Sequence, residues 1–171
     1  MKLEQRELER IVDGCKAKRR SSQQKIYELL YSKMLPVCCR YARSEDEAKD
    51  ILQDGFIKVF EKIEQYNTGG SFEGWVRRII VNTAIDAYRK NKKEVFIDDE
   101  SRIKDEKDWE DIENESEYSE LSINDIVEAM QSLSPGYQTV FNLYVMEGYT
   151  HQEIANELEI NIGTSKSNLA K

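Results

Sequence analysis

Residues that could carry enzyme chemistry are sparse in this sequence. His151 is the only histidine, and the three cysteines, Cys15, Cys38 and Cys39, do not have the spacing of a metal site. The sequence contains no glycine-rich loop that would bind phosphate and no Ser/His/Asp set. We therefore expect no catalytic residue, no metal ligand and no cofactor.

Residues suited to nucleic-acid binding gather on one predicted helix, over residues 71–90. At about 100° per residue, one face carries Phe72, Trp75, Val76, Ile79 and Thr83, and the opposite face carries Arg77, Arg78, Val81, Asn82, Ile85, Tyr88 and Arg89. Arginine binds phosphate, apolar and aromatic groups stack on unpaired bases, and asparagine can bind a base edge. Two interpretations stay open: a nucleic-acid surface, or a helix packed on both faces with its arginines reaching solvent.

A second unusual surface is predicted on the helix that follows the capping box of Ser44 and Glu47. Asp50 and Asp54 stand four residues apart, a like-charge pair that mildly destabilises an isolated helix. The outer face could be a docking surface for a basic partner helix, with Gln53 and Ile57 beside the acids, or a solvated acidic face. The residues alone slightly favour the solvated face.

The C-terminal segment has the spacing of a helix-turn-helix. Thr150 and Glu153 form a capping box, and a tight turn at 159–161 separates two short helices. Ala155 is small where the helices must cross, and Asn161 can cap the second helix. That helix would present Thr164, Lys166 and Ser167 outward, as a major-groove reader requires. A plain helical hairpin is the alternative, and the spacing and capping together favour DNA binding.

The elements that position these residues are all predicted to be helices, which makes the fold class all-α. Only two prolines and eight glycines interrupt sequences rich in helix-forming residues. Gly14 is expected to stop the first helix, Ser21 and Gln24 to cap the second, and Pro36 to kink or interrupt it. Helices are predicted at about 3–13, 21–43, 44–63, 71–90, 123–132, 134–148, 150–158 and from 162 onward.

Charge divides the chain into parts. The net charge is −8, but residues 94–120 hold thirteen acidic and three basic side chains, a net of −10, so the remainder is slightly basic. That stretch lacks periodicity and reads as a flexible, self-repelling linker. We expect two small helical domains joined by it. The boundaries are an N-terminal helix at 1–20, a first domain at 21–93, the acidic linker at 94–121 and a second domain at 122–171.

The N-terminus is charged, and no apolar run approaches the length of a membrane span. An odd number of cysteines without a secretory signal argues against a disulfide framework. We expect a reduced, cytoplasmic protein with no membrane insertion.

Two separated segments resemble one family. Residues 47–60 look like the polymerase-binding motif of the extracytoplasmic-function (ECF) sigma factors of the sigma-70 family, in conserved region two. Residues 72–90 look like the promoter-melting segment that follows it, and Leu133-Ser134-Pro135 with the helix-turn-helix resembles region four. The order, the spacing and the acidic linker also match. The resemblance implies a non-enzymatic subunit that brings core RNA polymerase to promoter DNA and helps to open it.

The resemblance also implies roles for individual residues. The acidic surface would dock on the clamp helices of the polymerase largest subunit, and the loop at 66–71 would hold a base flipped out of the minus-ten element. The acidic linker would thread the RNA exit path, and an anti-sigma protein is an expected regulator. The implied core-polymerase residues are Asp50, Gln53, Asp54 and Ile57; the minus-ten residues are Tyr66, Asn67, Ser71, Trp75, Arg78, Asn82 and Arg89; and the minus-thirty-five residues are Thr164, Lys166, Ser167, Ala170 and Lys171.

Three departures from the family pattern stand out. Glu159 occupies a turn position where the family usually has glycine, which would cost roughly 1 kcal/mol if the backbone there needs a positive φ. Ala170 replaces a larger side chain. The chain stops at Lys171, about two turns into the recognition helix, so we expect a truncated chain or a disordered tail, and weak minus-thirty-five binding.

Two other classes of protein remain as alternatives. One is a helix-turn-helix regulator that binds DNA without polymerase and uses its N-terminal domain as a dimerisation or sensing bundle. The other is a helical adaptor between proteins, with no role on DNA. DNA binding that requires core polymerase would indicate the sigma factor rather than the stand-alone regulator. The absence of any salt-dependent DNA binding, with or without polymerase, would indicate the protein adaptor.

Overall fold

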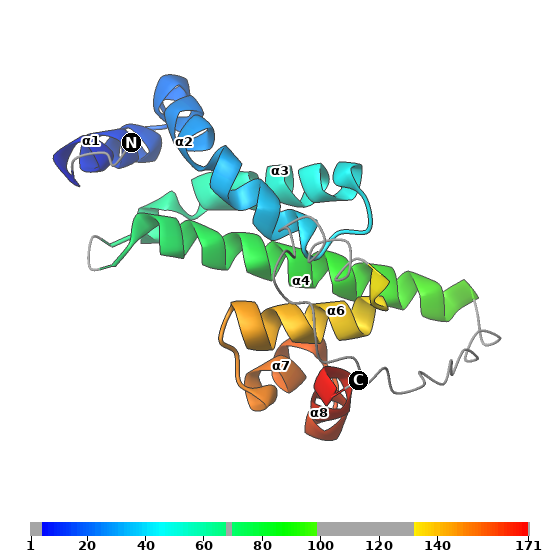
Figure 1. Ribbon diagram of the computed structural model, residues 1–171. Coiled ribbons are helices and arrows are strands. Elements are labelled where there is room, and N and C mark those ends of the chain that lie inside the picture. The colour runs from blue at the N-terminus through cyan, green and yellow to red at the C-terminus, as the bar shows by residue number, and fades with distance from the viewer. Residues whose placement is uncertain (1–4, 68–69, 99–131, 171) are drawn as a thin grey trace, which may run out of the picture.

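The structure, a computed structural model, describes residues 5–67, 70–98 and 132–170, and every regular element in those ranges is a helix (Figure 1). The predicted all-α class is therefore confirmed. Residues 123–131 of the predicted helix at 123–132, most of the acidic linker and Lys171 lie outside the described residues.

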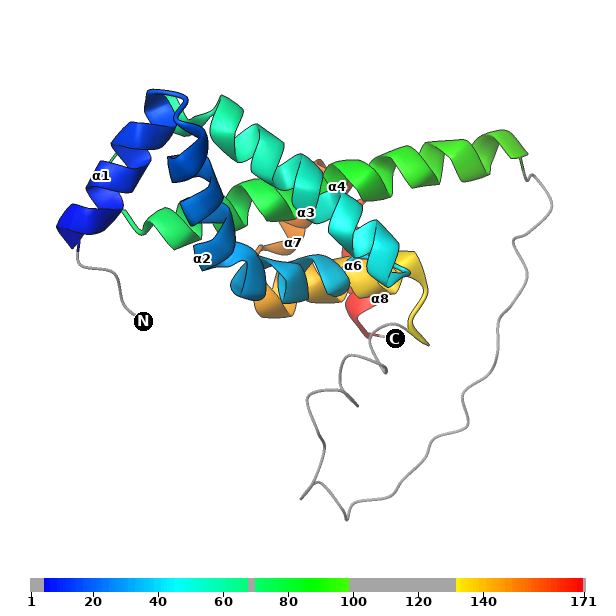
Figure 2. The ribbon, with the colours of Figure 1, turned by 90° about the horizontal axis from the view of Figure 1, so that it is seen from above.

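The N-terminal unit consists of four α-helices and one short 3₁₀ helix, η1. Helices α2, α3 and α4 pack together as a bundle, and α1 packs on α2 and η1 (Figures 1 and 2). Apolar residues at helical spacing fill the bundle, with Ile26 and Met34 from α2, Leu52 and Val59 from α3 and Ile80 from α4 almost fully buried. The bounds are α1 Gln5–Lys16, α2 Arg20–Cys39, α3 Glu45–Glu61, η1 Ile63–Gln65 and α4 Phe72–Asp98.

The junction between α1 and α2 differs from the prediction. Gly14 does not stop α1, which runs to Lys16; a Cβ on Gly14 would lie 2.1 Å from Ser22 Oγ, so the glycine lets the two helices approach closely. The turn is made by Lys18 at φ 56°, and the N-cap of α2 is Arg19, without a side-chain cap. The predicted capping box of Ser21 is therefore wrong, and Gln24 instead donates a hydrogen bond to Glu28.

Two further helix boundaries were mispredicted. Helix α2 continues through Pro36, which removes one backbone hydrogen bond, and the helix ends at Cys39 rather than near residue 43. Helix α4 runs to Asp98 rather than about residue 90, so it extends into the stretch assigned to the linker. No glycine or proline stands between residues 91 and 98 to end it.

The C-terminal unit contains α6 Pro135–Phe141, the π-helical turn η2 Asn142–Met146, α7 His151–Leu158 and α8 Ile162–Ala170. Ser134 is the N-cap of α6 with Pro135 in its first turn, as predicted. The capping box of Thr150 and Glu153 is present in full. Val140, Leu143, Ile154 and Leu158 form the apolar centre of this unit.

The two units meet along α4. Helices α2 and α3 lie on one side of α4, and α6 and α7 lie on the other, so α4 stands between them (Figures 1 and 2). Val81 and Ile85, which belong to the face opposite the bundle's core, are 2% and 1% exposed. In this arrangement Val81 and Ile85 are packed, whereas Arg78 and Asn82 on the same face stay exposed.

The three cysteines are free thiols within the described residues. Burial raises the pKa of Cys15 to about 11 and that of Cys38 to about 12. At neutral pH these two thiols are therefore protonated and unreactive, which makes them small apolar packing groups.

Glu159 adopts the left-handed conformation, at φ 53° and ψ 46°, in the turn between α7 and α8. We predict that Glu159→Gly raises the free energy of unfolding by about 1 kcal/mol, because glycine has no Cβ to clash in this conformation. Urea denaturation followed by circular dichroism measures the change.

Two substitutions control this measurement. Lys18→Gly, at the matching φ of 56° in the N-terminal unit, should stabilise the chain similarly. Glu28→Gly, on the exposed face in the middle of α2, should destabilise it by roughly 1 kcal/mol. A loss of stability in the Glu159→Gly variant would contradict the strain assigned to the turn.

Candidate nucleic-acid and partner interfaces

The acidic face of α3, defined by Asp50, Gln53, Asp54 and Ile57, is exposed along its length. Ile57 has 48% of its surface exposed, which is unusual for an isoleucine in a packed bundle. Among the described residues, neither Asp50 nor Asp54 has a cation within ion-pair distance, whereas neighbouring Lys49 pairs with Glu45 at 2.7 Å. The face thus presents two uncompensated carboxylates beside an apolar side chain.

The side chains on the opposite side of α3 pack in the bundle and hold the acidic face in place. Ile51, Leu52, Phe56 and Val59 are buried in the bundle. A Cβ on Gly55 would lie 2.3 Å from Ile80 Cδ1, so Gly55 allows α3 and α4 to pack closely. The Ser44 hydroxyl accepts a hydrogen bond from the Glu47 amide at 3.2 Å, while the Glu47 carboxylate accepts one from the Arg43 amide rather than closing a full capping box.

An aromatic cluster anchors the chain at the start of α4. Tyr66 contacts Phe72 edge-on, with ring centroids 5.0 Å apart, and lies 5.4 Å from Trp75. The Tyr66 hydroxyl donates a hydrogen bond to the Gly70 carbonyl at 2.8 Å, and its ring is buried. Ser71 caps α4 by accepting a hydrogen bond from the Gly74 amide at 3.2 Å.

The predicted minus-ten residues are thus spread over different environments. Tyr66 lies in the aromatic cluster and Trp75 is half-buried beside it, whereas Asn67 and Ser71 are exposed. Arg78 and Asn82 are exposed on α4, and Arg89 is half-buried. The structure brings Arg78 and Asn82 together one turn apart, and both line the cleft described below.

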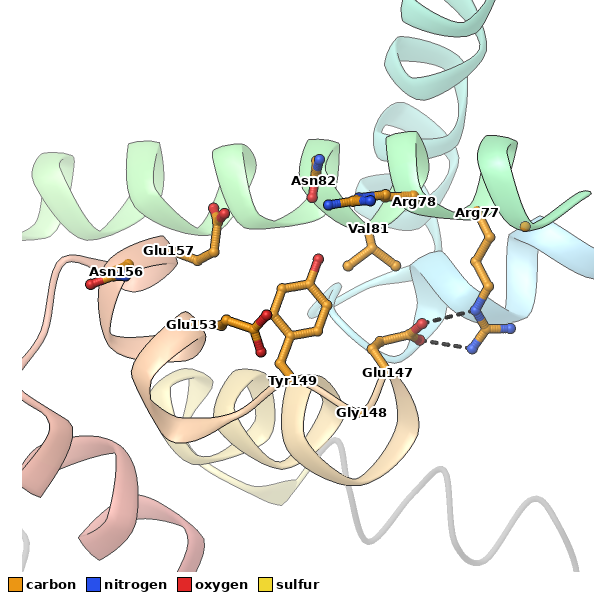
Figure 3. A pocket seen from close by; sticks show the side chains of 11 residues that line it. Arg77, Arg78, Val81, Asn82, Glu147, Gly148, Tyr149, Glu153, Asn156 and Glu157 are labelled. Carbon is orange, nitrogen blue, oxygen red and sulfur yellow. Dashed lines mark hydrogen bonds and ion pairs between the residues drawn. The ribbon is translucent and has the colours of Figure 1, made fainter. Parts of the chain in front are cut away.

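We call Arg77, Arg78 and Arg89 the arginine face of α4. Carboxylates of the C-terminal unit contact this face. Arg77 donates two hydrogen bonds to Glu147, from Nε to Oε2 at 2.9 Å and from Nη2 to Oε1 at 2.7 Å (Figure 3). The Nη2 atom of Arg40 donates to the same Oε1 at 3.0 Å. Only 8% of the Glu147 side chain is exposed, so this carboxylate is shielded and shared by two guanidinium groups.

The local backbone explains how Glu147 reaches this position. In the π-helical turn η2 the Glu147 amide donates to the Asn142 carbonyl, five residues back, which widens the end of the helix. The Asn142 side chain is fully buried and donates a hydrogen bond to the Arg40 carbonyl. The hydrogen bond to Glu147 also raises the pKa of Arg77, because it stabilises the charged guanidinium.

A cleft of about 440 Å³ separates the arginine face from the C-terminal unit. Val81 and Tyr149 point toward each other across it, while Glu153 and Glu157 lie opposite α4 (Figure 3). Its lining residues are Gly74, Arg77, Arg78, Val81, Asn82, Glu147, Gly148, Tyr149, Glu153, Asn156 and Glu157.

The only histidine of the sequence, His151, connects α7 to α8. His151 Nδ1 lies 3.0 Å from the buried Ser165 Oγ, and the imidazole stacks on Tyr144 with centroids 4.5 Å apart. Ser165 therefore faces inward, and the predicted readers Thr164, Lys166, Ser167 and Ala170 are exposed on α8.

Sequence reasoning missed the residues that join the two units: Arg40, Asn142 and Glu147. One signal was present for Asn142, because this polar residue stands between Val140 and Leu143 where the helical period buries side chains. Glu147 and Arg40 carry no such signal, since charged residues at helix ends are normally solvated.

The described residues contain neither a metal-binding cluster nor a membrane-spanning helix. In residues 5–67, 70–98 and 132–170, no group of three or more His, Cys, Asp or Glu side chains is placed to hold a metal ion. No helix in the same ranges is long and apolar enough to cross a bilayer.

Comparison with known protein families identifies the two helical units. The sigma-70 region 2 family model matches residues 26–94, and the sigma-70 region 4 family model matches residues 123–171. Region 2 followed by region 4 is the arrangement of sigma-70-type transcription initiation factors.

Relatives refine the class. The chain is 32% identical over 129 residues to the RNA polymerase sigma factor SigV of Bacillus subtilis, covering 75% of this chain and 73% of that protein. It is 29% identical over 149 residues to the ECF RNA polymerase sigma factor SigE of Mycolicibacterium smegmatis, covering 85% of this chain and 53% of that protein. The chain thus spans about half the length of the mycobacterial relative. It belongs to the ECF sigma factors of the sigma-70 family, which confirms the resemblance seen in the sequence.

A solved structure shares the fold. The sigma factor RpoE of Bartonella quintana, crystallised with the anti-sigma factor NepR, aligns with a TM-score of 0.50 at 22% identity. The alignment covers 86% of this chain and 89% of the other. The predicted pair of helical domains is therefore confirmed.

We predict that two of the ion pairs between the units, Arg77–Glu147 and Arg89–Glu157, differ in strength. In a double-mutant cycle, Arg77→Ala and Glu147→Ala should show a coupling free energy of about 1.5 kcal/mol, because the bidentate pair is shielded. The Arg89 and Glu157 pair, at 3.5 Å with 29% and 45% side-chain exposure, should show about 0.5 kcal/mol or less. Urea denaturation of the single and double variants measures both, and equal couplings would contradict the assignment.

Proposed function

We propose that this chain recruits core RNA polymerase to promoters and helps to open promoter DNA, without catalysing a reaction itself. The observation that carries the proposal is the exposed acidic face of α3, with Asp50 and Asp54 unpaired among the described residues and Ile57 beside them. A rigid, uncompensated carboxylate pair next to an apolar side chain fits a basic partner helix, which for this family is the clamp helices of the polymerase largest subunit.

The remaining roles follow the division of the chain. Residues 21–93 would bind polymerase and the minus-ten element, 94–121 would connect the domains, and 122–171 would bind the minus-thirty-five element. The minus-ten contacts would come from Asn67, Ser71, Arg78, Asn82 and Arg89. The aromatic side chains of Tyr66 and Trp75 would support these residues from within the protein. The minus-thirty-five contacts would come from the exposed side of α8, and from Lys171 beyond the described residues.

Partners and compartment follow from this role. A sigma factor acts where core polymerase and the chromosome are, so we place the protein in the cytoplasm. The solved relative RpoE is bound to an anti-sigma factor. By analogy we expect an anti-sigma protein to regulate this chain.

The stand-alone DNA-binding regulator is the second candidate, favoured by the helix-turn-helix of α7 and α8. Such a regulator would bind promoter DNA in the absence of polymerase. The proposed sigma factor would need polymerase for that binding.

Asp54→Arg tests the docking role directly. We predict that it weakens binding to core polymerase at least about tenfold, because it places a cation opposite a basic partner, and that it leaves the fold unchanged since Asp54 is exposed. Competition against a labelled primary sigma factor measures the affinity. Glu28→Arg, with the same charge change on α2, should bind normally; unchanged binding by Asp54→Arg would refute the docking assignment.

Asn82→Ala tests the reading of the minus-ten element. We predict that it slows open-complex formation by about tenfold or more, because a side chain that hydrogen-bonds a base edge contributes on the order of 1–3 kcal/mol. Its affinity for core polymerase should stay at the wild-type value, measured in the same competition assay. Equal losses in polymerase binding and promoter opening would rule out a base-specific role for Asn82.

A further inference from the structure

The tight turn between α1 and α2 carries a cluster of cations that the proposed function does not use. Residues 14–25 contain five basic side chains and no acidic one, in a chain whose net charge is −8. Four of the five lie at the turn itself, and we call them the basic turn: Lys16, Lys18, Arg19 and Arg20. Three of these side chains are exposed, and Lys16 is half-buried.

Backbone hydrogen bonds hold the basic turn in one shape. The Lys18 amide donates to the Cys15 carbonyl at 2.9 Å. The Arg19 amide donates to the Gly14 carbonyl, also at 2.9 Å. Because Gly14 has no Cβ, the start of α2 can approach the end of α1 closely. The four cations are therefore held near one another, although like charges repel.

No carboxylate of the described residues neutralises the basic turn. The first turn of α2 contains no acidic residue, so the positive end of the helix dipole adds to the repulsion among the cations. The ion pairs of the described residues use other cations, namely Lys33, Arg40, Lys49, Lys58, Arg77 and Arg89. The basic turn thus presents a concentrated positive charge that attracts an anionic partner.

Two of these cations stand where the backbone favours other residues. Lys18 has a φ of 56°, in the left-handed region where glycine is the least strained residue. Arg19 is the N-cap of α2 but makes no side-chain cap, which serine, threonine, aspartate or asparagine would supply. Local stability therefore does not explain why these two residues are basic, whereas binding to an anionic partner would.

The surroundings of the basic turn favour DNA over an acidic protein as that partner. The exposed large apolar side chains of the described residues all lie outside residues 14–25, whereas the centre of a protein interface is usually apolar. Ser21 is exposed beside the cations, and its hydroxyl can join arginine and lysine in binding phosphate.

The position of the basic turn also fits DNA. The turn lies at the same end of the N-terminal unit as the start of α4 (Figures 1 and 2). Helix α1 packs on η1, which leads into the loop at 66–71. The cations are thus on the part of the chain next to the loop assigned to the minus-ten element.

We propose that the basic turn binds the phosphate backbone of promoter DNA beside the loop at 66–71, as an electrostatic contact that does not read sequence. The ligands are the side chains of the four cations, with arginine able to bind two phosphate oxygens at once. The location rests on the proposed role of the loop in binding the minus-ten element. The binding of phosphate itself does not depend on that role.

The test compares two double variants of the whole chain that change the net charge equally. The turn variant carries Lys18→Gly and Arg19→Ser, which removes two cations and supplies residues that the backbone favours there. The control carries Arg10→Gln and Arg43→Gln, two exposed cations outside the basic turn and outside the proposed binding residues. Fluorescence anisotropy measures binding to labelled single-stranded oligo(dT) over a range of salt concentrations, and thermal denaturation measures stability.

We expect the turn variant to unfold at a higher temperature than the wild type but to bind oligo(dT) about tenfold more weakly at low salt. The slope of log affinity against log salt concentration should fall by about 1.4, because each phosphate contact on a single strand contributes about 0.7. A gain in stability together with a loss of affinity is a result that a purely structural turn would not give. The control should lose less than about twofold in affinity, because screening weakens charges remote from the DNA.

Several outcomes would overturn the inference. Unchanged affinity and salt slope in the turn variant is one, and equal losses in both variants is another. A wild type that shows no salt-dependent binding to oligo(dT) is a third. A poly-glutamate peptide serves as a parallel probe, and a greater loss of affinity for the peptide than for oligo(dT) would assign the turn to an acidic protein instead of DNA.

Promoter opening with core polymerase separates this inference from the proposed function. Normal opening by a wild type whose turn variant keeps full affinity for oligo(dT) would overturn the basic turn alone. A wild type that binds oligo(dT) through the turn but opens no promoter would overturn the proposed function and the promoter location, while phosphate binding by the turn would stand.

Discussion

The structure depends on one helix, α4, with both of its long faces occupied. One face closes the bundle with α2 and α3 through apolar contacts such as Val76 and Ile80, both fully buried. The other meets the C-terminal unit through the Glu147 carboxylate, which Arg77 and Arg40 share. The first contact is a dry core, and the second combines ion pairs with the buried apolar side chains of Val81 and Ile85.

The same division explains why the functional surfaces can be separate. The acidic face of α3 is exposed, whereas the buried side of the same helix packs on α2 and α4. The arginine face of α4 is the surface whose accessibility depends on how the units are arranged.

Much of this could be predicted from local rules. The capping box of Thr150 and Glu153, the Ser134-Pro135 helix start and the strained Glu159 turn each depend on neighbouring residues, and the structure has all three. The exposed acidic face of α3 followed from helical periodicity. The Ser21 cap failed because the chain turns at Lys18 and the N-cap of α2 is Arg19, two residues before Ser21. Gly14 instead allows close packing against Ser22. The pairing of Glu147 with Arg40 and Arg77 could not be predicted, because it joins residues 107 and 70 positions apart.

The most direct measurement is competition between this chain and a labelled primary sigma factor for core polymerase, because the account centres on the exposed acidic face of α3. The account predicts competitive binding that Asp54→Arg weakens while the circular dichroism of the variant stays unchanged. Failure of the folded chain to compete, or equal competition by the wild type and Asp54→Arg, would contradict it.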